Sequence, residues 1–317
     1  MSVPGGRGGP DLPWGGPRFW QGVWRVADPK ITLASVASML LGLAAAAHDG
    51  PVRWGALLAT VLGIFCLEAA KNASGELFDF DSGTDLRVAE EDRSPFSGGK
   101  RVLVDGLWTR TQTIAVAGAF YAAGAVFGLF LAIREPAVLW IGLLGAALAY
   151  FYHAPPLKLA YRGLGELAVF LTYGPLLCAG AYVVQRGEVP FRVVLLAVPV
   201  GLVIAAFLFI NEFPDARADA ASGKRTLVVR LGRPLAAQAF VLFPIVAFTG
   251  LFLLPFVTSL PRGVWLGFVG LPHAVLATLR LRAHPDTTRE IVTAQSWTLL
   301  SFCLLALGSA IGMLVLG

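Results

Sequence analysis

The chain has 317 residues, of which 56% are hydrophobic and only 14% are charged. Soluble domains carry about 25% charged residues, so this composition and a mean hydropathy of +0.70 exclude an ordinary soluble domain. The sequence therefore predicts an integral membrane protein. Its net charge of +5 follows from the placement of Lys and Arg around a membrane and gives no support to nucleic-acid binding.

The first residues form a Gly- and Pro-rich segment that contains Trp14, Trp20 and Trp24. This segment lacks the cleavage pattern of a signal peptide. We expect residues 1–25 to be a flexible tail that leads into an interfacial segment. The remainder, residues 26–317, is expected to form one membrane domain.

Nine apolar runs follow, and each approaches the length needed to cross about 30 Å of hydrocarbon at 1.5 Å per residue. Leu, Ala, Gly and Val dominate these runs without the alternation of a barrel strand, so we expect helices. The fold class is therefore an all-α bundle of nine transmembrane helices. The expected spans are residues 31–47, 54–70, 112–134, 136–152, 164–184, 191–213, 235–256, 264–281 and 292–316.

The positions of Lys and Arg indicate the orientation of the bundle. With the N-terminus inside, the tail and the even-numbered connections hold most of these residues. The other side holds Arg53, Arg134, Arg186, Arg192 and Arg262. Because positively charged loops stay in the cytoplasm, we expect the N-terminus and the long polar loops there. The expected location is the inner (cytoplasmic) membrane.

Two of the connecting loops are long, polar and alike. Residues 71–106 and 211–232 each begin close to an Asn, continue with spaced carboxylates and contain a similar phrase, SGGKRVLV or SGKRTLVV. This recurrence predicts two pseudo-repeats that meet around one site, and chance similarity of two polar loops is the alternative. The pseudo-repeats are expected at roughly residues 31–160 and 164–290, followed by the last helix.

Both loops begin with an amide and two carboxylates at helical spacing, so each set occupies one face of a helix. The two sets are Asn72, Glu76 and Asp79, and Asn211, Asp215 and Asp219. Pro214 lies within the second set and disfavours helical geometry at Phe213. We therefore expect a kink, or the start of a new helix, at Pro214.

Carboxylates one helical turn apart repel each other, and a shared cation explains two such sets better than self-pairing. All the donors are oxygens, with no His or Cys nearby, which indicates Mg²⁺ rather than zinc. Mg²⁺ bridges a few carboxylates to substrate phosphates. Positively charged side chains nearby would bind a diphosphate. These are Arg93, Lys100, Arg101, Lys224 and Arg225. The alternative is a positively charged belt with solvated acidic partners.

A third polar segment, YFYHAPPLKLAYRGLGE at 150–166, joins the fourth and fifth spans on the same side. Its double Pro and its Gly residues predict a turn. The side chains expected to reach a site from this turn are Tyr152, Lys158, Tyr161, Arg162 and Glu166. We expect His153 to be an interfacial residue without a chemical role. Glu68 is an intramembrane carboxylate and therefore a functional candidate.

The second loop resembles the second Asp-rich motif of the UbiA superfamily of intramembrane prenyltransferases, which has an Asn, a D-x-x-x-D pair and then G-K-x-T-L. The matching residues are Asn211, Asp215, Asp219, Gly223, Lys224, Thr226 and Leu227. The first loop is similar to the first motif of that family. It matches at Asn72, Glu76, Asp79 and Asp85, and its R-x-P-x-x-S-G phrase is met loosely by Arg93, Pro95, Ser97 and Gly98.

The resemblance covers roughly residues 25–317, with two departures in the first motif. Gly75-Glu76 stands where the family commonly has Asn-Asp, and six residues instead of four separate Asp79 from Asp85. The longer gap and the phrase YRGLGE at 161–166 are similar to the branch that prenylates 1,4-dihydroxy-2-naphthoate in the menaquinone pathway. We therefore favour that branch over the 4-hydroxybenzoate branch.

The resemblance implies a bundle with a lateral opening to lipid and a cytoplasmic polar cap. It also implies Mg²⁺-dependent transfer of a polyprenyl group from an isoprenyl diphosphate to an aromatic quinone precursor. The implied metal ligands are Asn72, Glu76, Asp79, Asp85, Asn211, Asp215 and Asp219. The implied diphosphate-binding residues are Arg93, Lys100, Lys158, Arg162, Lys224 and Arg225. The residues expected to take part in the reaction are Asp79, Asp215, Lys158 and Tyr161.

Other interpretations remain open at this point. A terpene cyclase of the same fold would use the same ionisation without an acceptor, and a prenyltransferase could use a non-aromatic acceptor. A cation transporter is a third class. Transporters place their ion sites near the middle of the bilayer on broken helices, whereas the acidic sets here lie at the ends of spans, which argues against transport.

Overall fold

The computed structural model describes residues 13–316, and every regular element within that range is helical. The prediction of an all-α protein is confirmed. In chain order the elements are α1 (Pro17–Ala27), α2 (Pro29–Asp49), α3 (Trp54–Ser82), η1 (Glu90–Asp92), α4 (Arg110–Ala132), α5 (Ala137–Phe151), η2 (Leu159–Arg162), α6 (Gly165–Leu171), η3 (Thr172–Leu176), α7 (Leu177–Arg186), α8 (Phe191–Ala221), α9 (Leu227–Leu231), α10 (Arg233–Ala239), α11 (Leu242–Val257), η4 (Arg262–Gly270), α12 (Leu271–Ala283) and α13 (Thr288–Val315).

Eight helical segments of the described chain are long and apolar enough to cross a membrane. Three of them are composite. α6, η3 and α7 form one span around Pro175, α10 joins α11, and η4 joins α12. The ninth expected span is α5, which has only 15 residues. Every expected span therefore has a helical counterpart, and the multi-pass character of the protein is confirmed.

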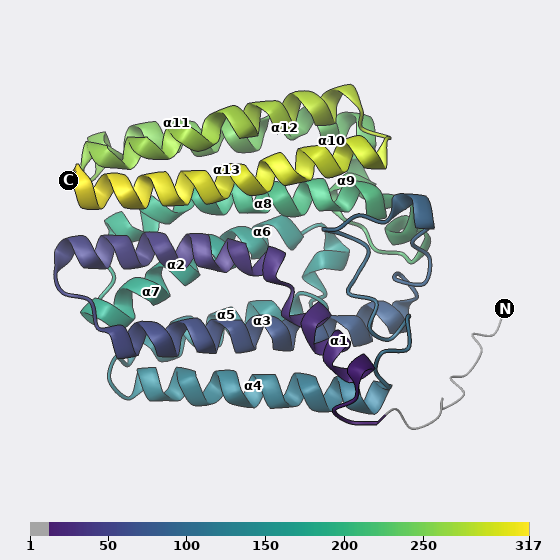
Figure 1. Cartoon of the computed structure of the whole chain (residues 1–317). Coiled ribbons are helices and arrows are strands. Elements are labelled where there is room, and N and C mark those ends of the chain that lie inside the picture. Colours follow the sequence, from purple (N-terminus) through teal and green to yellow (C-terminus); the bar gives the residue numbers. More distant parts are fainter. Residues whose placement is uncertain (1–12, 317) are drawn as a thin grey trace.

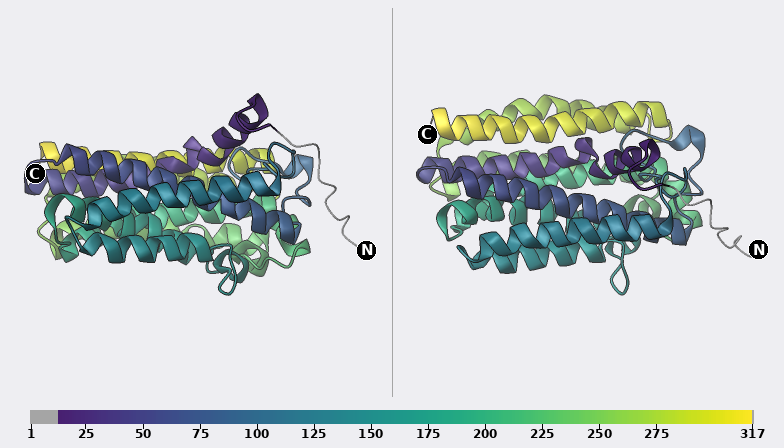
Figure 2. Two further views of the ribbon diagram at one scale, coloured as in Figure 1. Left: turned by 90° about the horizontal axis from the view of Figure 1, so that it is seen from below. Right: turned by 60° about the horizontal axis from the view of Figure 1, so that its bottom comes forward.

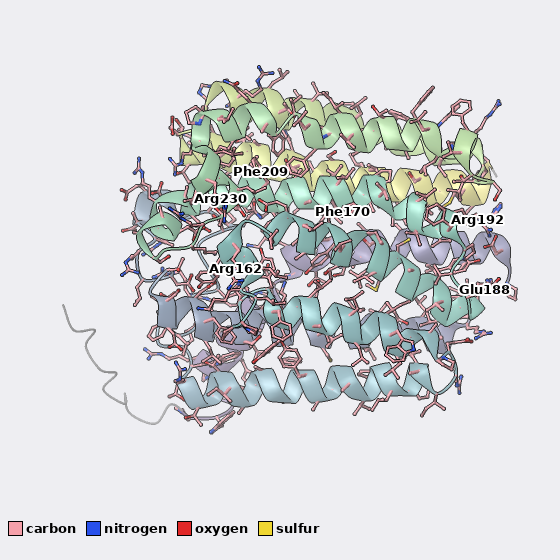
Figure 3. The ribbon with its side chains drawn as sticks, turned by 180° about the vertical axis from the view of Figure 1, so that it is seen from behind. Arg162, Phe170, Glu188, Arg192, Phe209 and Arg230 are labelled. Atoms are coloured by element: carbon pink, nitrogen blue, oxygen red, sulfur yellow. The ribbon has the colours of Figure 1, made fainter. Side chains whose placement is uncertain are left out.

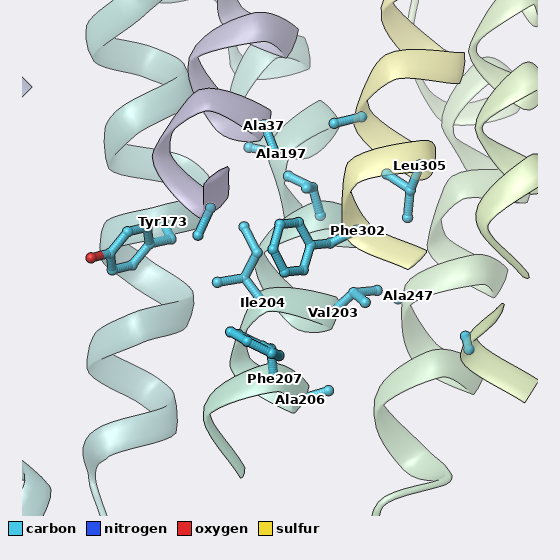
Figure 4. Close-up of a cluster of buried hydrophobic side chains, with 14 of the residues drawn as sticks. Ala37, Tyr173, Ala197, Val203, Ile204, Ala206, Phe207, Ala247, Phe302 and Leu305 are labelled. Atoms are coloured by element: carbon cyan, nitrogen blue, oxygen red, sulfur yellow. The ribbon is translucent and has the colours of Figure 1, made fainter. Parts of the chain in front are cut away.

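The long helices lie side by side in a bundle (Figures 1 and 2). α8 is central because it packs against α2, α6, α11 and α13. Its apolar residues form the main core with side chains of these neighbours (Figure 4). Phe207, for example, packs edge-on against Phe302 with ring centroids 5.7 Å apart. Burial of such rings is the dominant contribution to packing inside the bundle.

The long polar connections gather at one end of the bundle, and the last helix ends at the other (Figure 1). Arg162 and Arg230 lie at the polar end, whereas Glu188 and Arg192 lie at the opposite end (Figure 3). The loops expected to face the cytoplasm therefore share one face of the protein.

The segment expected to be a flexible tail is helical from Pro17 to Ala27, which corrects that prediction for these residues. Residues 1–12 lie outside the described range. The indole of Trp108 donates to the Phe19 carbonyl at 3.0 Å and packs against Gly22, which fixes α1 to the polar end. Trp20 and Trp24 are exposed on α1. An amphipathic helix with exposed Trp suits the membrane interface that the sequence predicted.

The acidic sets lie on extensions of two spanning helices. α3 continues through the first set to Ser82, and α8 continues through the second set to Ala221. The prediction of a new helix at Pro214 is wrong, because α8 includes that residue. One missing N–H in a helix of 31 residues is offset by the packing of the helix on both sides of it. The division into pseudo-repeats stays a prediction.

The closest helix crossing joins η4 to α13 through two glycines. A Cβ added to Gly312 would lie 1.7 Å from the Gly263 carbonyl oxygen, and one added to Gly263 would lie 2.0 Å from the Gly312 carbonyl oxygen. Only glycine permits this approach. Small residues allow such close packing between membrane helices.

We predict that Gly312→Ala lowers the thermal unfolding midpoint of the protein in detergent, because the added methyl group forces α13 away from η4 at a cost of about 1–3 kcal/mol or more. The control is Gly118→Ala on the exposed face of α4, where an added Cβ meets nothing within 4 Å. That variant should be neutral or gain up to about 1 kcal/mol. Equal midpoints for the two variants would contradict the close approach.

Candidate active site

The two acidic sets converge on one polar cavity of about 200 Å³ at the polar end of the bundle. The segment 96–100, His153 and Lys224 complete its walls. Each set enters from a different helix, so the residues meet only because the ends of α3 and α8 lie together. The α3 and α8 residues that line the cavity are Asn72, Gly75, Glu76, Asp79, Leu208, Asn211, Glu212, Asp215 and Asp219.

Lys224 is the cation at the centre of this arrangement. Its Nζ lies 3.4 Å from Asp219 Oδ1 and 5.5 Å from the centre of the Tyr161 ring. Burial opposes the charged form of this ammonium, but the carboxylates of Asp219 and Asp79 outweigh it and raise the pKa of Lys224 well above its usual range. Lys224 is therefore a permanent positive charge inside the acidic cavity.

Asp79 is held from two sides by the turn that follows α5. The Tyr161 hydroxyl donates to Asp79 Oδ1 at 2.6 Å, and His153 Nε2 lies 3.4 Å from Asp79 Oδ2. Burial lowers the pKa of His153 to about 4 despite the neighbouring carboxylate, so this imidazole is neutral at pH 7. The structure thus places His153 in the cavity wall rather than at an outer interface. Gly75 makes room for the ring, because a Cβ there would lie 3.0 Å from it.

Glu76 holds the segment 97–102 over the cavity. Its Oε1 accepts the backbone N–H groups of Lys100 and Arg101 at 2.7 and 3.1 Å, and its Oε2 accepts that of Val102 at 2.7 Å. From the opposite helix, Asp215 Oδ2 accepts the Gly98 N–H at 3.0 Å. The segment is therefore fixed by one carboxylate from each acidic set. Glu76 already has backbone donors on both oxygens, unlike the other predicted ligands.

Asp85 lies behind this segment, against Gly99. A Cβ on Gly99 would lie 2.5 Å from both carboxylate oxygens of Asp85, and Gly99 has a positive φ of 73°, so glycine is required there. Burial, together with the negative charges of Asp79 and Glu76, raises the pKa of Asp85 to about 8. Asp85 is therefore close enough to the acidic sets for their charges to change its pKa.

Two buried oxygens of the site have no hydrogen-bond partner, namely Oδ1 of Asn211 and Oδ1 of Asp215, and Oδ1 of Asp219 has only the ion pair with Lys224. Leaving such atoms unpaired costs about 1–3 kcal/mol each, and more for charged groups, so the site is arranged for a further partner. Within residues 13–316, no three His, Cys, Asp or Glu side chains form a preassembled metal cluster. The oxygen donors therefore lie in one cavity but do not form a complete metal-binding site by themselves.

The predicted cations divide into two groups. Lys100 and Lys224 line the cavity, and the charge of Lys158 acts on Asp79 from the turn beside it. The structure does not bring the other three to the cavity. Arg93 lines a basic cleft on the other side of the segment 96–100, Arg162 is exposed and donates to the Pro156 carbonyl, and Arg225 is exposed. Arg101 turns toward the Asp85 carbonyl at 3.1 Å.

Glu212 is an acidic residue of the site that the sequence patterns did not assign to it, whereas Glu166 was expected to reach the site from the turn at 150–166. Glu212 on α8 lines the cavity and accepts the Val228 N–H at 3.2 Å, and the buried carboxyl of Glu166 lies beside it. Glu212 directly follows Asn211, out of step with the i, i+4 spacing that identified the set. A carboxylate that directly follows a long apolar run is costly to bury, and this could have identified Glu212 from the sequence.

An apolar cavity of about 150 Å³ borders the polar one between α3, α4, α5 and the composite span of α6, η3 and α7. Tyr152 lines both cavities. Gly63, Gly124, Gly142 and Gly145 keep the walls of the apolar cavity open. Gly142 on α5 lines this cavity and is exposed.

Residues 35–300 match the UbiA prenyltransferase family. The chain belongs to this family. It is 30% identical to the 2-carboxy-1,4-naphthoquinone phytyltransferase of Synechocystis sp. over 69% of each chain. It is 25% identical to the 1,4-dihydroxy-2-naphthoate octaprenyltransferase of Bacillus subtilis over 92% of each chain. The family recognition and the prenyltransferase class predicted from the motifs are confirmed.

Solved structures show the same fold. A UbiA homolog from Archaeoglobus fulgidus bound to GPP and Mg²⁺ superposes with a TM-score of 0.62 at 15% identity, covering 91% of this chain and 99% of that one. The apo structure of a UbiA homolog from Aeropyrum pernix gives a TM-score of 0.61 at 18% identity, covering 90% and 97%. The UbiA bundle expected from the sequence is confirmed.

We predict that Glu76→Gln frees the segment 97–102. A glutamine offers one acceptor oxygen and an NH₂ group that cannot accept, so at least one backbone N–H loses its partner. Amide hydrogen exchange of Lys100 to Val102, followed by mass spectrometry, should accelerate by about 10- to 100-fold. Glu91→Gln, an exposed carboxylate in the same long loop, is the control. Unchanged exchange in Glu76→Gln would show that other contacts hold the segment.

Proposed function

We propose that this UbiA-family prenyltransferase transfers a polyprenyl group from an isoprenyl diphosphate to a naphthoate-type aromatic acceptor, with Mg²⁺ as cofactor. The observation that carries the proposal is the junction at Tyr152 between an acid-lined polar cavity and an apolar cavity. A prenyl diphosphate has one polar and one apolar part, joined at the carbon that reacts. The naphthoate substrates named for the two relatives support the acceptor class.

The residues present fit Mg²⁺. Asn211, Asp215, Asp219 and Asp79 line the same cavity and are all hard oxygen donors, and Oδ1 of Asn211 and of Asp215 has no hydrogen-bond partner. Mg²⁺ keeps several waters and binds few carboxylates together with substrate phosphates. This agrees with a set of protein oxygens that does not enclose an ion by itself. We assign Asp79, Asp215, Asp219 and Asn211 as its ligands, with Asp85 and Asn72 beside them. When bound, the ion would neutralise charge on the departing diphosphate.

Glu76 has a different role in this proposal from the one expected at first. Its oxygens are occupied by three backbone donors, so we propose that it positions the segment 97–102. That segment closes the polar cavity on the side of Gly98 and Gly99. Exclusion of water there strengthens the attraction between the site and a diphosphate.

The diphosphate would be bound by the cations that the structure brings to the cavity. Lys224 stands inside it, and Lys100 lies on the segment above it. Lys158 approaches from the turn beside Tyr161, 5.2 Å from the centre of that ring. Tyr161 fixes the orientation of Asp79 through its hydroxyl. These side chains orient the leaving group so that the allylic carbon lies toward Tyr152, whose ring stabilises positive charge.

The prenyl tail would occupy the α4 and α5 side of the apolar cavity, away from Glu68 and Lys71. Each buried CH₂ contributes about 0.8 kcal/mol to binding. This arrangement keeps the tail in hydrocarbon while its headgroup stays in the polar cavity. By the distribution of Lys and Arg, we propose that the polar end faces the cytoplasm, in the inner membrane.

We predict that Asp79→Asn and Asp215→Asn each abolish prenyl transfer while the protein stays folded. Each replaces a charged donor of the site by a neutral amide of the same shape. The matched control is Asp81→Asn. Asp81 is two residues from Asp79 on the same helix but is exposed and pairs with Arg110 at 2.5 Å. Detergent-purified protein with radiolabelled geranyl diphosphate and 1,4-dihydroxy-2-naphthoate gives the measurement. Near-normal activity of either site variant would refute the assignment.

We also predict that removal of divalent cations by EDTA stops the reaction and that added Mg²⁺ restores it. The reason is that the unpaired carboxylates cannot offset a diphosphate without a cation between them. Chromatography of the lipid extract identifies the product. A prenylated naphthoate supports the proposal, whereas a hydrocarbon formed without acceptor would indicate a cyclase. Full activity in EDTA would contradict the metal requirement.

A further inference from the structure

A second polar cluster lies within the apolar cavity, away from the acidic sets. We call it the inner cluster, and its four residues come from α2, α3 and η3. Within the described wall of this cavity, Glu68 and Lys71 are the charged residues. All other lining side chains are apolar, glycine, hydroxyl or phenol groups. The members of the inner cluster are Ser35, Glu68, Lys71 and Tyr173.

The contacts of the inner cluster leave one charged atom without a partner. The Ser35 hydroxyl donates to Glu68 Oε1, and Lys71 Nζ donates to the Tyr173 hydroxyl at 3.2 Å. Glu68 Oε2 has no partner at hydrogen-bond distance, although the side chain is only 7% exposed and the Tyr173 hydroxyl and Lys71 ammonium act on the same carboxylate. A buried carboxylate oxygen without a donor is costly. The side chain is thus prepared for a donor that enters through the cavity.

The position of the inner cluster matches the place where a second substrate must lie. Lys71 directly precedes Asn72, which lines the polar cavity, and Tyr152 lines both cavities. Tyr173 lies at the edge of the hydrophobic core, and its hydroxyl points away from Phe302 and Ile204 (Figure 4). The cluster therefore borders the junction where the reacting carbon of the donor would be placed.

We propose that the inner cluster is the subsite for the aromatic acceptor, and this inference rests on the proposed function. Glu68 Oε2 accepts a hydrogen bond from a ring hydroxyl, and the Lys71 ammonium binds a carboxylate on the ring. Tyr173 holds Lys71 in place. A hydroxyl that donates to a carboxylate enriches its ring in electron density, which attack on an allylic cation requires. The ligand class is a hydroxylated aromatic carboxylate.

Direct binding tests this assignment without requiring turnover. The full-length protein in detergent is titrated calorimetrically, under nitrogen, with 1,4-dihydroxy-2-naphthoate and with 2-naphthoate, which lacks both hydroxyls. Glu68→Gln should weaken binding of the hydroxylated ligand by about 10- to 100-fold, the loss typical of a hydrogen bond to a charged group. Its affinity for 2-naphthoate should stay within about twofold of wild type. Lys71→Met should weaken both ligands, because both carry the carboxylate.

Two Tyr→Phe variants show whether Tyr173 acts by positioning Lys71 or whether the loss of any buried hydroxyl has the same effect. Tyr173→Phe should weaken both ligands by removing the partner of Lys71. Tyr182→Phe is the control, because its hydroxyl donates to Asp49 Oδ2 at 2.5 Å at the opposite end of the same span. That control should bind both ligands as wild type does. Unfolding midpoints of all variants are compared with wild type.

The proposal is overturned if Glu68→Gln binds both ligands with wild-type affinity. It is also overturned if Glu68→Gln weakens both ligands equally, since that would reflect a structural change. Transfer of a prenyl group by the wild-type protein is measured separately. Loss of the proposed function would appear there as absence of product, while the binding differences between the two ligands would persist.

Discussion

Carboxylates that repel one another are held together at the ends of two helices around the ammonium group of Lys224. This compensation allows α3 and α8 to bring their acidic faces into one cavity instead of splaying apart. The same carboxylates organise the segment 97–102, which Glu76 and Asp215 hold through its backbone N–H groups. In this site the negative charges are compensated by backbone N–H donors and by the Lys224 ammonium, and some carboxylate oxygens have no hydrogen-bond partner.

The spans could be predicted because hydrocarbon imposes length and composition on each helix. The acidic sets could be predicted because helical spacing places their members on one face. The roles of individual cations could not. Lys224 and Arg225 are neighbours in an irregular segment, yet Lys224 lines the cavity and Arg225 is exposed. The sequence alone does not show which side chain of such a segment points into the cavity.

Two site residues show a further limit of sequence reasoning. Glu76 was expected among the metal ligands, yet its side chain accepts three backbone N–H groups of the segment 97–102. The sequence analysis placed His153 at an interface, whereas its imidazole lies in the cavity wall. The small Gly75 opposite leaves space for its imidazole. Complementary sizes on segments far apart in the chain become visible only when the fold brings them together.

α5 is the shortest of the membrane helices, with 15 residues, or about 22 Å at 1.5 Å per residue. That is less than the thickness of the hydrocarbon layer, so the bilayer must thin beside α5, which forms part of the wall of the apolar cavity. Under the proposed function, the prenylated product would pass from this cavity into the surrounding leaflet beside the short helix.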